Sequence, residues 1–507
     1  MSAVAYPLLH QQKEWHIYPL QWRFLARGFW AAFIVGCLFL SPLAGFALFV
    51  FFAAVGLLWR RDEPPILVFC IAYQWLFVVT GYFYWHLVGV YPGLPVVGNL
   101  EAAVFLSLVG LIVLIAGIRT SSLLLGRQFA LKQRKLRGAN SVYSVSRLFW
   151  WVIALYMVNW TIEFSPMEIQ FNAAQIIYRM LEFRSIFFFL LIFTILQQRK
   201  GYGYGLLGCL YVWIPSFASM MSAFSGMFVM VFIALLGQWR PWSNSIAERR
   251  QSVRIAWAAA GISAALIFMA ITWQGAVKHV WRQKLISGAV LGSTTEKAEA
   301  FMSTVQEGLS ALEWSSAVES LSARTSSGVG FFSHVLDRVP TLVPHENGHL
   351  TLRALEHTWK PRVLFPEKPN LGSDSWFVTH YAGLPAAGEE QGTSIGLGYM
   401  AEFYIDFGFL GMFVPIFLYG LTVGLLSSVL LRFSPSYEFY LSAIVIMLTQ
   451  HFTSYEGEIA KLLGGFVQTF LIFALLLRVP GPFLHRNLLA EERSINRQAN
   501  GGLSPAS

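Results

Sequence analysis

The chain is poor in charged residues: Asp, Glu, Lys and Arg together make up only 12% of its 507 residues. Soluble domains carry about a quarter of such residues, so this shortage excludes an ordinary water-soluble protein. The sequence also lacks a Gly-x-x-x-x-Gly-Lys loop and an Asp-x-Asp pair. Neither nucleotide hydrolysis nor a metal-bound nucleotide-sugar donor is therefore indicated.

Cysteine is equally scarce, since the chain has only Cys37, Cys70 and Cys209, each inside an apolar run. Their spacing excludes a zinc-binding cysteine pattern and gives no basis for a disulfide, so we interpret them as small core residues. The first apolar run begins only near Phe29, after a polar stretch. We therefore expect no cleavable secretory signal, and we expect the first span to remain in the mature protein.

What the chain does contain is hydrophobic residues, 56% of the total, and aromatic residues, 16%. Many runs approach the roughly 17 to 25 residues that cross a bilayer, and these predict an all-α polytopic membrane protein with about twelve transmembrane helices. The stretch 29–58 is broken at Ser41-Pro42 and predicts a tight hairpin of two spans. The other expected spans are 66–87, 100–118, 148–164, 185–196, 204–217, 226–236, 255–273, 407–431, 437–452 and 461–477.

Basic residues are unevenly distributed over the loops between these spans. Alternate loops place 23 of the 36 Lys and Arg on one side, together with only 7 of the 27 Asp and Glu. The loop 119–147 contains no acidic residue. Cytoplasmic loops carry such an excess of cations, so we expect both termini in the cytoplasm. A nucleic-acid-binding patch is the less favoured explanation of the same charges.

The expected spans divide the chain into four regions. Residues 1–277 hold about nine membrane helices, and residues 399–480 hold about three more. Between them, residues 278–398 form one large periplasmic loop with short helices, including a helix-like stretch at 295–322 and a Pro- and Gly-rich part from 340. Long loops in compact proteins are usually functional. The cytoplasmic tail, 481–507, is expected to be disordered.

The large loop carries an unusual number of basic side chains for the outer face of a membrane. Arginine binds phosphate oxygens in a bidentate manner, so an anionic ligand would explain them. Solvated loop charges balanced by nearby glutamates are the alternative, which we favour for any single residue. The cations are Arg282, Arg324, Arg338, Arg353, Lys360, Arg362 and Lys368, and six histidines accompany them: His279, His334, His345, His349, His357 and His380.

Two segments at the end of this loop resemble the Wzy-type polymerases of O-antigen and exopolysaccharide synthesis. The first has the pattern Pro-Arg-x-Leu-x-Pro-x-Lys-Pro, carried here by Pro361, Arg362, Leu364, Pro366, Lys368 and Pro369. The second has Glu-x-Tyr-x-x-x-Gly-x-x-Gly, carried by Glu402, Tyr404, Gly408 and Gly411. These motifs cover about fifty residues. The span count and the position of the loop extend the resemblance along the chain.

The resemblance implies an enzyme of the bacterial inner membrane that joins undecaprenyl-diphosphate-linked oligosaccharides by metal-independent inverting glycosyl transfer, without a cofactor. Its partners would be lipid-linked oligosaccharides, membrane lipids and a chain-length regulator, and it would bind no nucleic acid. Arg362 and Arg282, with Lys368, Arg338 and Arg353, would hold the diphosphate. Glu402 would act as the base. Tyr399, Tyr404, Asp406 and His380 would complete the substrate site.

Glu402 has a second interpretation, because a carboxylate where the chain enters the membrane can also fix the fold by pairing with a loop arginine. On a helix, Glu402 and Asp406 would lie one turn apart and share a face with Tyr399. Other polar residues at outward span ends could line a sugar groove, with aromatic residues as stacking surfaces, although aromatic anchoring is the commoner role. These are Glu163, Arg179, Arg184, His451, Glu456, Glu458 and Lys461, with Trp376, Phe377, Tyr381 and Tyr455.

A competing motif is His345-Glu346-Asn347-Gly348-His349, which matches His-Glu-x-x-His of zinc metalloproteases. That motif works on a helix, where both histidines face one metal ion. Asn347-Gly348 disfavours a helix there. Two further alternatives share the membrane location: a ligase that transfers finished glycan to another acceptor, and a lipid-glycan flippase. The near absence of charges within the spans argues against the flippase.

Overall fold

In the computed structural model the chain is an all-α protein. The structure describes residues 22–38, 41–60, 63–94, 97–138, 141–163, 171–213, 225–240, 245–286, 294–360, 365, 367–368, 374–386 and 395–490. Its helices are α1 (Trp22–Leu38), α2 (Pro42–Leu58), α3 (Ile66–Val88), α4 (Leu100–Gly138), α5 (Val145–Glu163), α6 (Phe171–Leu181), α7 (Phe183–Gln198), α8 (Tyr202–Trp213), α9 (Ser225–Leu236), α10 (Ile246–Thr272), η2 (Trp273–Val277), α11 (Lys278–Ile286), α12 (Thr294–Ser310), α13 (Trp314–Arg338), α14 (His349–Trp359), α15 (Asp374–Phe377), η3 (Val378–Ala382), α16 (Tyr399–Gly411), α17 (Phe413–Phe433), α18 (Tyr437–His451), α19 (Ile459–Arg478) and α20 (Gly481–Leu488).

Seven helical stretches of the described chain are long and apolar enough to cross a membrane, which makes this a multi-pass membrane protein by composition. They are Ile66–Val88, Leu100–Gly126, Val145–Ile162, Ile176–Gln198, Ile246–Val277, Phe413–Phe433 and Ile459–Arg478. The expected spans at 29–58, 226–236 and 437–452 correspond to shorter helices, α1, α2, α9 and α18. Residues 214–217 of the expected span 204–217 lie outside the described residues.

The hairpin expected at Ser41-Pro42 is present. Ser41 has extended backbone angles, and its Oγ accepts a hydrogen bond from the amide of Ala44, which caps the start of α2. Pro42 occupies the first helical position, where its missing N–H costs nothing. The residue pair that interrupts the apolar run is therefore the cause of the turn.

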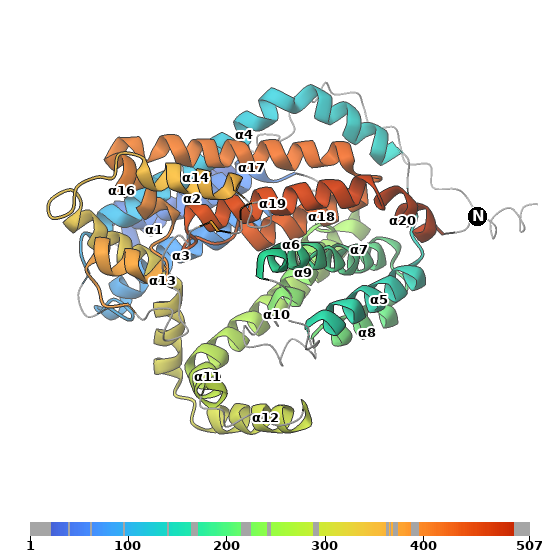
Figure 1. Cartoon of the computed structure of the whole chain (residues 1–507), viewed down its shortest axis with the longest axis horizontal. Coiled ribbons are helices and arrows are strands. Elements are labelled where there is room, and N and C mark those ends of the chain that lie inside the picture. The colour runs from blue at the N-terminus through green and yellow to red at the C-terminus, as the bar shows by residue number, and fades with distance from the viewer. Residues whose placement is uncertain are drawn as a thin grey trace, which may run out of the picture.

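The long helices α4 and α17 run side by side along one face of the molecule (Figure 1). Glycines bring the two backbones together: a Cβ at Gly420 would lie 2.3 Å from the carbonyl oxygen of Leu114, and one at Gly117 would lie 2.3 Å from that of Phe417. Small residues at helix contacts allow such close approach in membranes. These two helices form a frame, against which α2, α3, α13, α16, α18 and α19 pack directly.

Helix α7 connects this frame to the helices α5, α8 and α9, since it contacts α18 on one side and those helices on the other. From Ile186 to Leu191 every side chain of α7 is fully buried. A helix that is apolar all round belongs in an interior. Helix α10, by contrast, is mostly exposed along its apolar span, as expected for a surface that faces lipid.

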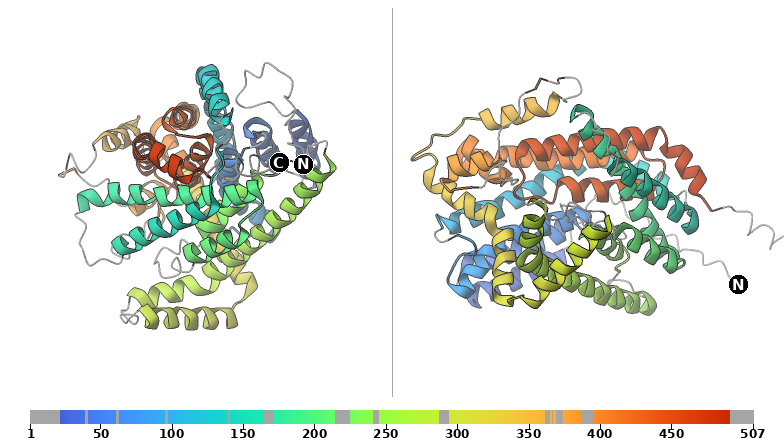
Figure 2. Two further views of the ribbon diagram at one scale, coloured as in Figure 1. Left: turned by 90° about the vertical axis from the view of Figure 1, so that its right-hand side faces the viewer. Right: turned by 60° about the horizontal axis from the view of Figure 1, so that its bottom comes forward.

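Two parts of the large loop differ from expectation. The helix-like stretch at 295–322 is two helices, because the chain is non-helical between α12 and α13, and α13 continues to Arg338. Helix α13 packs against α3: a Cβ at Gly81 would lie 2.6 Å from the Cβ of Ser326. Thus α13 is a long element of the bundle. Helices α11 and α12 lie at an edge of the molecule, away from α14 and α16 (Figures 1 and 2).

The tail differs as well. Disorder was expected from residue 481, but α20 is helical and the residues after it pair with the segment before α5. Tyr143 and Leu489 form an antiparallel bridge, and the Ala490 amide donates to the Val142 carbonyl over 2.9 Å. Leu484 and Leu488 are buried against the bundle. An amphipathic turn with apolar residues four apart is sufficient to fix this segment.

Candidate functional site

The Glu–Tyr–Gly motif of the sequence forms α16, a short buried helix that precedes the span α17. It begins after Gly398, whose φ of +93° favours glycine and whose Cβ would lie 2.7 Å from the Tyr455 carbonyl oxygen. It is broken at Gly408, which has φ +70° and ψ −168°. The span expected from residue 407 therefore starts only at Phe413. Gly398 thus precedes α16, Gly408 kinks it, and the second glycine of the motif, Gly411, is its last residue.

Glu402 and Asp406 share α16 but serve two different neighbours. The amide of Ile459, the first residue of α19, donates to Glu402 Oε2 over 3.1 Å. Asp406 accepts the amides of Leu350 at 3.0 Å and Thr351 at 2.7 Å, and the Thr351 hydroxyl at 2.5 Å. Both carboxylates are buried, 5% and 1% exposed. Each stabilises the start of a helix whose amides would otherwise lack acceptors.

The two tyrosines of α16 are also engaged within the protein. The hydroxyl of Tyr399 donates to Gln74 Oε1 over 2.8 Å, and that of Tyr404 donates to the Val339 carbonyl over 3.1 Å. Tyr399 is 1% exposed and Tyr404 is 8% exposed. These contacts tie α16 to α3 and to the end of α13. The substrate contacts expected for Tyr399, Tyr404 and Asp406 stay predictions.

A second carboxylate, Glu346, lies beside α16 and was assigned by the sequence only to the zinc motif. Its Oε1 accepts a hydrogen bond of 2.8 Å from the hydroxyl of Tyr381 in η3. Its amide donates to the Ile405 carbonyl over 3.0 Å, which fixes the turn against α16. Burial raises the pKa of Tyr381, and the hydrogen bond to Glu346 raises it further. Tyr381 therefore stays protonated and donates to a half-buried carboxylate.

Two of the expected cations lie near this pair. The Arg338 guanidinium packs against Gly383, two residues beyond Tyr381: a Cβ at Gly383 would meet its atoms at 2.6 to 2.9 Å. The Nε of Arg338 is buried without a hydrogen-bond partner among the described residues. Arg353, on the exposed side of α14, is close enough for its charge to lower the pKa of Tyr381. Arg353 thus lies near the Glu346–Tyr381 pair, and Arg338 lies against the neighbouring Gly383; these four residues are called the polar cluster below.

His380 and Lys368 lie on the outer surface of the same region. The exposed His380 ring stacks on Trp376, with centroids 4.6 Å apart and an angle of 9° between the planes. The Lys368 ammonium donates to the carbonyl oxygen of His357 near the end of α14. Arg362 lies outside the described residues, as does the side chain of Arg282 on α11. Their roles therefore stay predictions.

The helix that the zinc motif requires is not formed. His345 and Glu346 lie in a turn, Asn347 has a φ of +50°, and α14 begins only at His349. The His345 ring is held by the Ile405 carbonyl, 3.1 Å from its Nδ1. No group of three His, Cys, Asp or Glu able to hold a metal ion occurs within the described ranges. The geometry of a metalloprotease is thus missing from this motif.

The secondary candidates separate into two groups. Arg324 pairs with Glu456 on the surface of the loop after α18. Deeper in the bundle, Arg179 lies 2.5 Å from Glu182, which is 3.7 Å from His451. The Thr469 hydroxyl lies 2.8 Å from Nε2 of the same histidine. These contacts join α6, α18 and α19 through buried polar groups, and an ion pair of this kind fixes helix positions.

Glu346 and Tyr381 are therefore the site residues that sequence reasoning missed. Both had been noted, one in the zinc motif and the other as a stacking surface. The two residues are 35 positions apart in the sequence and are joined by a side-chain hydrogen bond. Glu346 is held in place for this bond because its amide donates to the Ile405 carbonyl of α16. The Pro- and Gly-rich pattern of the loop predicts turns but not which turn faces which helix. No signal in one sequence could have paired them.

Comparison with known proteins adds one finding. Residues 254–480 match the model of a domain of unknown function, DUF8712. The matched part extends from α10 into the turn after α19, so it includes α13, α14, η3 and α16. No curated protein and no solved structure matches the chain. The polar cluster thus lies wholly inside the part of the chain that is similar to this uncharacterised domain.

Proposed function

We propose that this protein is a membrane polysaccharide polymerase of the Wzy type, which joins prenyl-diphosphate-linked oligosaccharides at the membrane surface. The observation that supports the proposal is the polar cluster: Arg353 lies near the Glu346–Tyr381 pair and Arg338 packs against Gly383, two residues beyond Tyr381, beside the helix that leads into a span. The Pro-Arg and Glu–Tyr–Gly motifs flank this cluster in the sequence. A reaction between anionic lipid-linked sugars needs both charge types at such a place.

In this proposal the side that carries residues 278–398, called here the loop side, faces the periplasm. The opposite side, called the basic side, carries Arg60, the loop 119–147 and Arg432 and faces the cytoplasm. Both termini are then cytoplasmic and about twelve helices cross the inner membrane of a bacterium. The excess of cations on the basic side supports this orientation.

The reaction is a single displacement. A hydroxyl oxygen of the acceptor glycan attacks the anomeric carbon of the donor glycan while the bond from that carbon to the diphosphate oxygen breaks. The electron pair of the broken bond leaves with prenyl diphosphate, and the hydroxyl proton passes to a carboxylate. Attack from the face opposite the leaving group inverts the anomeric configuration. No oxidant, reductant or nucleotide is consumed.

Cations stabilise the charge that grows on the leaving diphosphate. Arg338 fits this role because its guanidinium is half-buried and held against the backbone at Gly383. Arg353 contributes from α14, with Lys368 at the end of that helix. Arg362 and Arg282 complete the set on the strength of the resemblance. A guanidinium fork matches two phosphate oxygens at once, which favours arginine here.

Two carboxylates compete for the role of base. Glu402 is the residue that the resemblance implies. However, its Oε2 accepts a hydrogen bond from the amide of Ile459 at the start of α19, and Glu402 is only 5% exposed. Glu346 is more accessible, and Tyr381 holds it in place. A base needs one oxygen within hydrogen-bond reach of the attacking hydroxyl. We assign this step to Glu402 and treat Glu346 as the competitor, which mutagenesis separates.

The test is reconstitution of the full chain in vesicles with a purified lipid-linked oligosaccharide repeat unit as the only glycan. A polymerase gives a ladder of products that differ by one repeat unit, together with released prenyl diphosphate. A ligase gives no ladder, but transfers one glycan when a different acceptor lipid is added. Absence of both products, with a chain that remains folded, would refute glycosyl transfer.

A further inference from the structure

A groove opens on the basic side where α4 and α17 separate. The two helices are in close contact as far as Gly424, whose Cβ would lie 2.8 Å from the Cβ of Ser121. One turn farther along both helices, residues of α4 and α17 line an open space. The space between them, including its open mouth, amounts to about 550 Å³. The groove is lined by Leu125, Phe129, Lys132, Ser428, Leu431 and Arg432.

The groove lies at the end of two candidate spans. The apolar span of α4 ends at Gly126, so Lys132 follows it by about two turns, and Arg432 occupies the last turn of the span α17. A bilayer places its phosphate groups at this level, immediately outside the hydrocarbon core. One end of the groove therefore meets lipid tails, and the other meets headgroups.

Both walls of the groove carry a cation, Lys132 from α4 and Arg432 from α17. Lys132 is half-buried and has no carboxylate partner among the described residues. The stretch 119–147 contains seven Lys and Arg but no acidic residue. Arg432 adds a second cation from the facing helix. Basic pockets between helices on this kind of membrane face suit anionic lipid headgroups.

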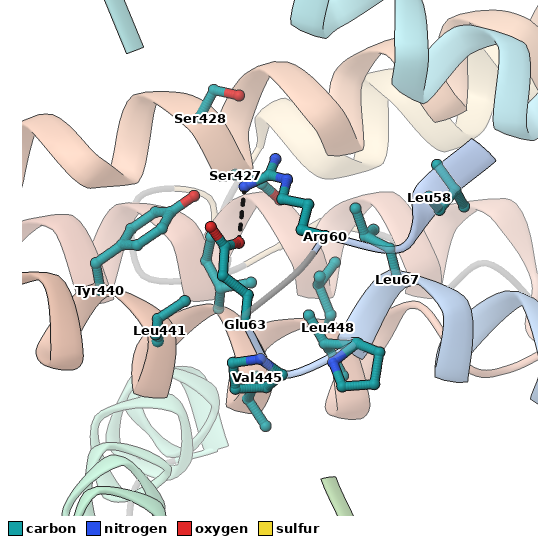
Figure 3. A pocket seen from close by; sticks show the side chains of 14 residues that line it. Leu58, Arg60, Glu63, Leu67, Ser427, Ser428, Tyr440, Leu441, Val445 and Leu448 are labelled. Atoms are coloured by element: carbon teal, nitrogen blue, oxygen red, sulfur yellow. Dashed lines mark hydrogen bonds and ion pairs between the residues drawn. The ribbon is translucent and has the colours of Figure 1, made fainter. Parts of the chain in front are cut away.

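A carboxylate beside the groove, Glu63, is already paired with arginines. Glu63 lines an adjoining pocket that shares Ser428 with the groove, and Figure 3 shows Arg60 turned toward it. Arg60 lies 3.1 Å and Arg137 2.5 Å from its oxygens, and Tyr437 donates to it over 2.5 Å. Glu63 thus fixes two arginines and a tyrosine. Lys132 and Arg432 are the cations that line the groove itself.

We propose that this groove binds an anionic phospholipid of the surrounding leaflet. The phosphate lies between Lys132 and Arg432, while the first carbons of an acyl chain lie against the half-buried side chain of Leu125. The occupant is argued from charge complementarity and from depth: the two cations match a phosphate, and the ends of two candidate spans place them at the level of lipid headgroups. The site stands apart from the glycan cluster, at the opposite end of α17 from α16.

The proposal is tested with the full chain purified in mild detergent, by native mass spectrometry during titration with phosphatidylglycerol or phosphatidylcholine. Wild-type protein should bind phosphatidylglycerol at least ten-fold more tightly. Lys132→Gln and Arg432→Gln should each weaken that binding roughly five-fold, the factor that corresponds to about 1 kcal/mol for each cation near the surface. Lys132→Arg keeps the charge and should retain the affinity.

The matched control is Arg134→Gln, because Arg134 is exposed on the opposite face of α4, roughly 200° from Lys132. It should leave lipid binding unchanged. Equal loss in this variant would overturn the proposal in favour of diffuse attraction. Equal affinity for both lipids would overturn it too, as would displacement of the lipid by excess inorganic phosphate, which would indicate an anion site only. A melting temperature measured without lipid verifies that each variant is folded.

Discussion

Glu402 and Asp406 lie one turn apart on α16, yet their carboxylates hold the starts of two different helices. Glu402 accepts the first amide of α19, while Asp406 accepts two amides and a hydroxyl at the start of α14. Helix α16 therefore positions the loop helix α14 and the span α19 at the same time. Any loss of these contacts moves the arginines of the loop relative to the spans.

Asp406 should be more important for stability than for chemistry. Asp406→Ala leaves two amides and a hydroxyl without an acceptor and is expected to cost about 1 to 3 kcal/mol of folding free energy. Asp406→Asn keeps one acceptor oxygen and should cost less. The measurement is the unfolding midpoint in detergent. If Asp406→Ala instead raised KM at an unchanged midpoint, a direct substrate contact would be the better explanation.

Replacement of the two carboxylates identifies the base. Glu402→Gln keeps an oxygen that can accept the Ile459 amide, so the protein should fold and bind substrate while its turnover falls at least 100-fold, the usual scale of general-base catalysis. Glu346→Gln also keeps its acceptor for Tyr381 and serves as the matched variant. Single-turnover rates in vesicles separate them. Loss of rate only in Glu346→Gln would transfer the role to Glu346.

The cations should act on the leaving group. Arg362→Ala is expected to abolish chain growth in cells and to leave single repeat units at the surface, because the diphosphate loses a bidentate partner. Arg338→Ala should lower turnover in the same way. Arg338→Lys keeps the positive charge but not the two-pronged guanidinium, so it should retain only part of the wild-type turnover. Gel analysis of surface glycans reports chain length. Ladders of normal length in Arg362→Ala would contradict the assignment.

The contact between α4 and α17 should tolerate no extra atom. Gly420→Ala forces a methyl group against a carbonyl oxygen at 2.3 Å, and overpacking of this kind costs about 1 to 3 kcal/mol. Gly261→Ala is the matched control, since a Cβ at Gly261 in the span α10 meets no atom within 4 Å. It should be neutral or slightly stabilising. Unfolding midpoints compare the two, and equal midpoints would refute the close contact.

Chelators should leave polymerisation unchanged, because the proposed chemistry uses arginine and lysine where other transferases use a metal ion. The assay is the ladder of products in vesicles with and without a strong zinc chelator. His349→Ala is the companion variant, since its side chain is exposed at the start of α14. Strong inhibition by the chelator, together with loss of activity in His349→Ala, would revive the zinc hypothesis.

Local features of the chain were predictable because their causes are local. The lengths of the apolar runs predicted helices that the structure contains, and Ser41-Pro42 predicted the turn between α1 and α2. The same reasoning failed near Gly408, whose backbone angles kink α16, so that the span α17 starts only at Phe413. It also failed at residues 481–490, where pairing with the segment at Tyr143 orders a polar tail.

By itself the sequence determined that this is an all-α membrane protein with cations on one side, because hydropathy and charge are additive along the chain. The directions of the polar side chains in the large loop were decided only by the tertiary structure. Glu346 meets Tyr381, and Asp406 meets α14, because distant backbone segments pack together and their amides need acceptors. Such pairings depend on which surfaces are buried together, and no local pattern encodes that.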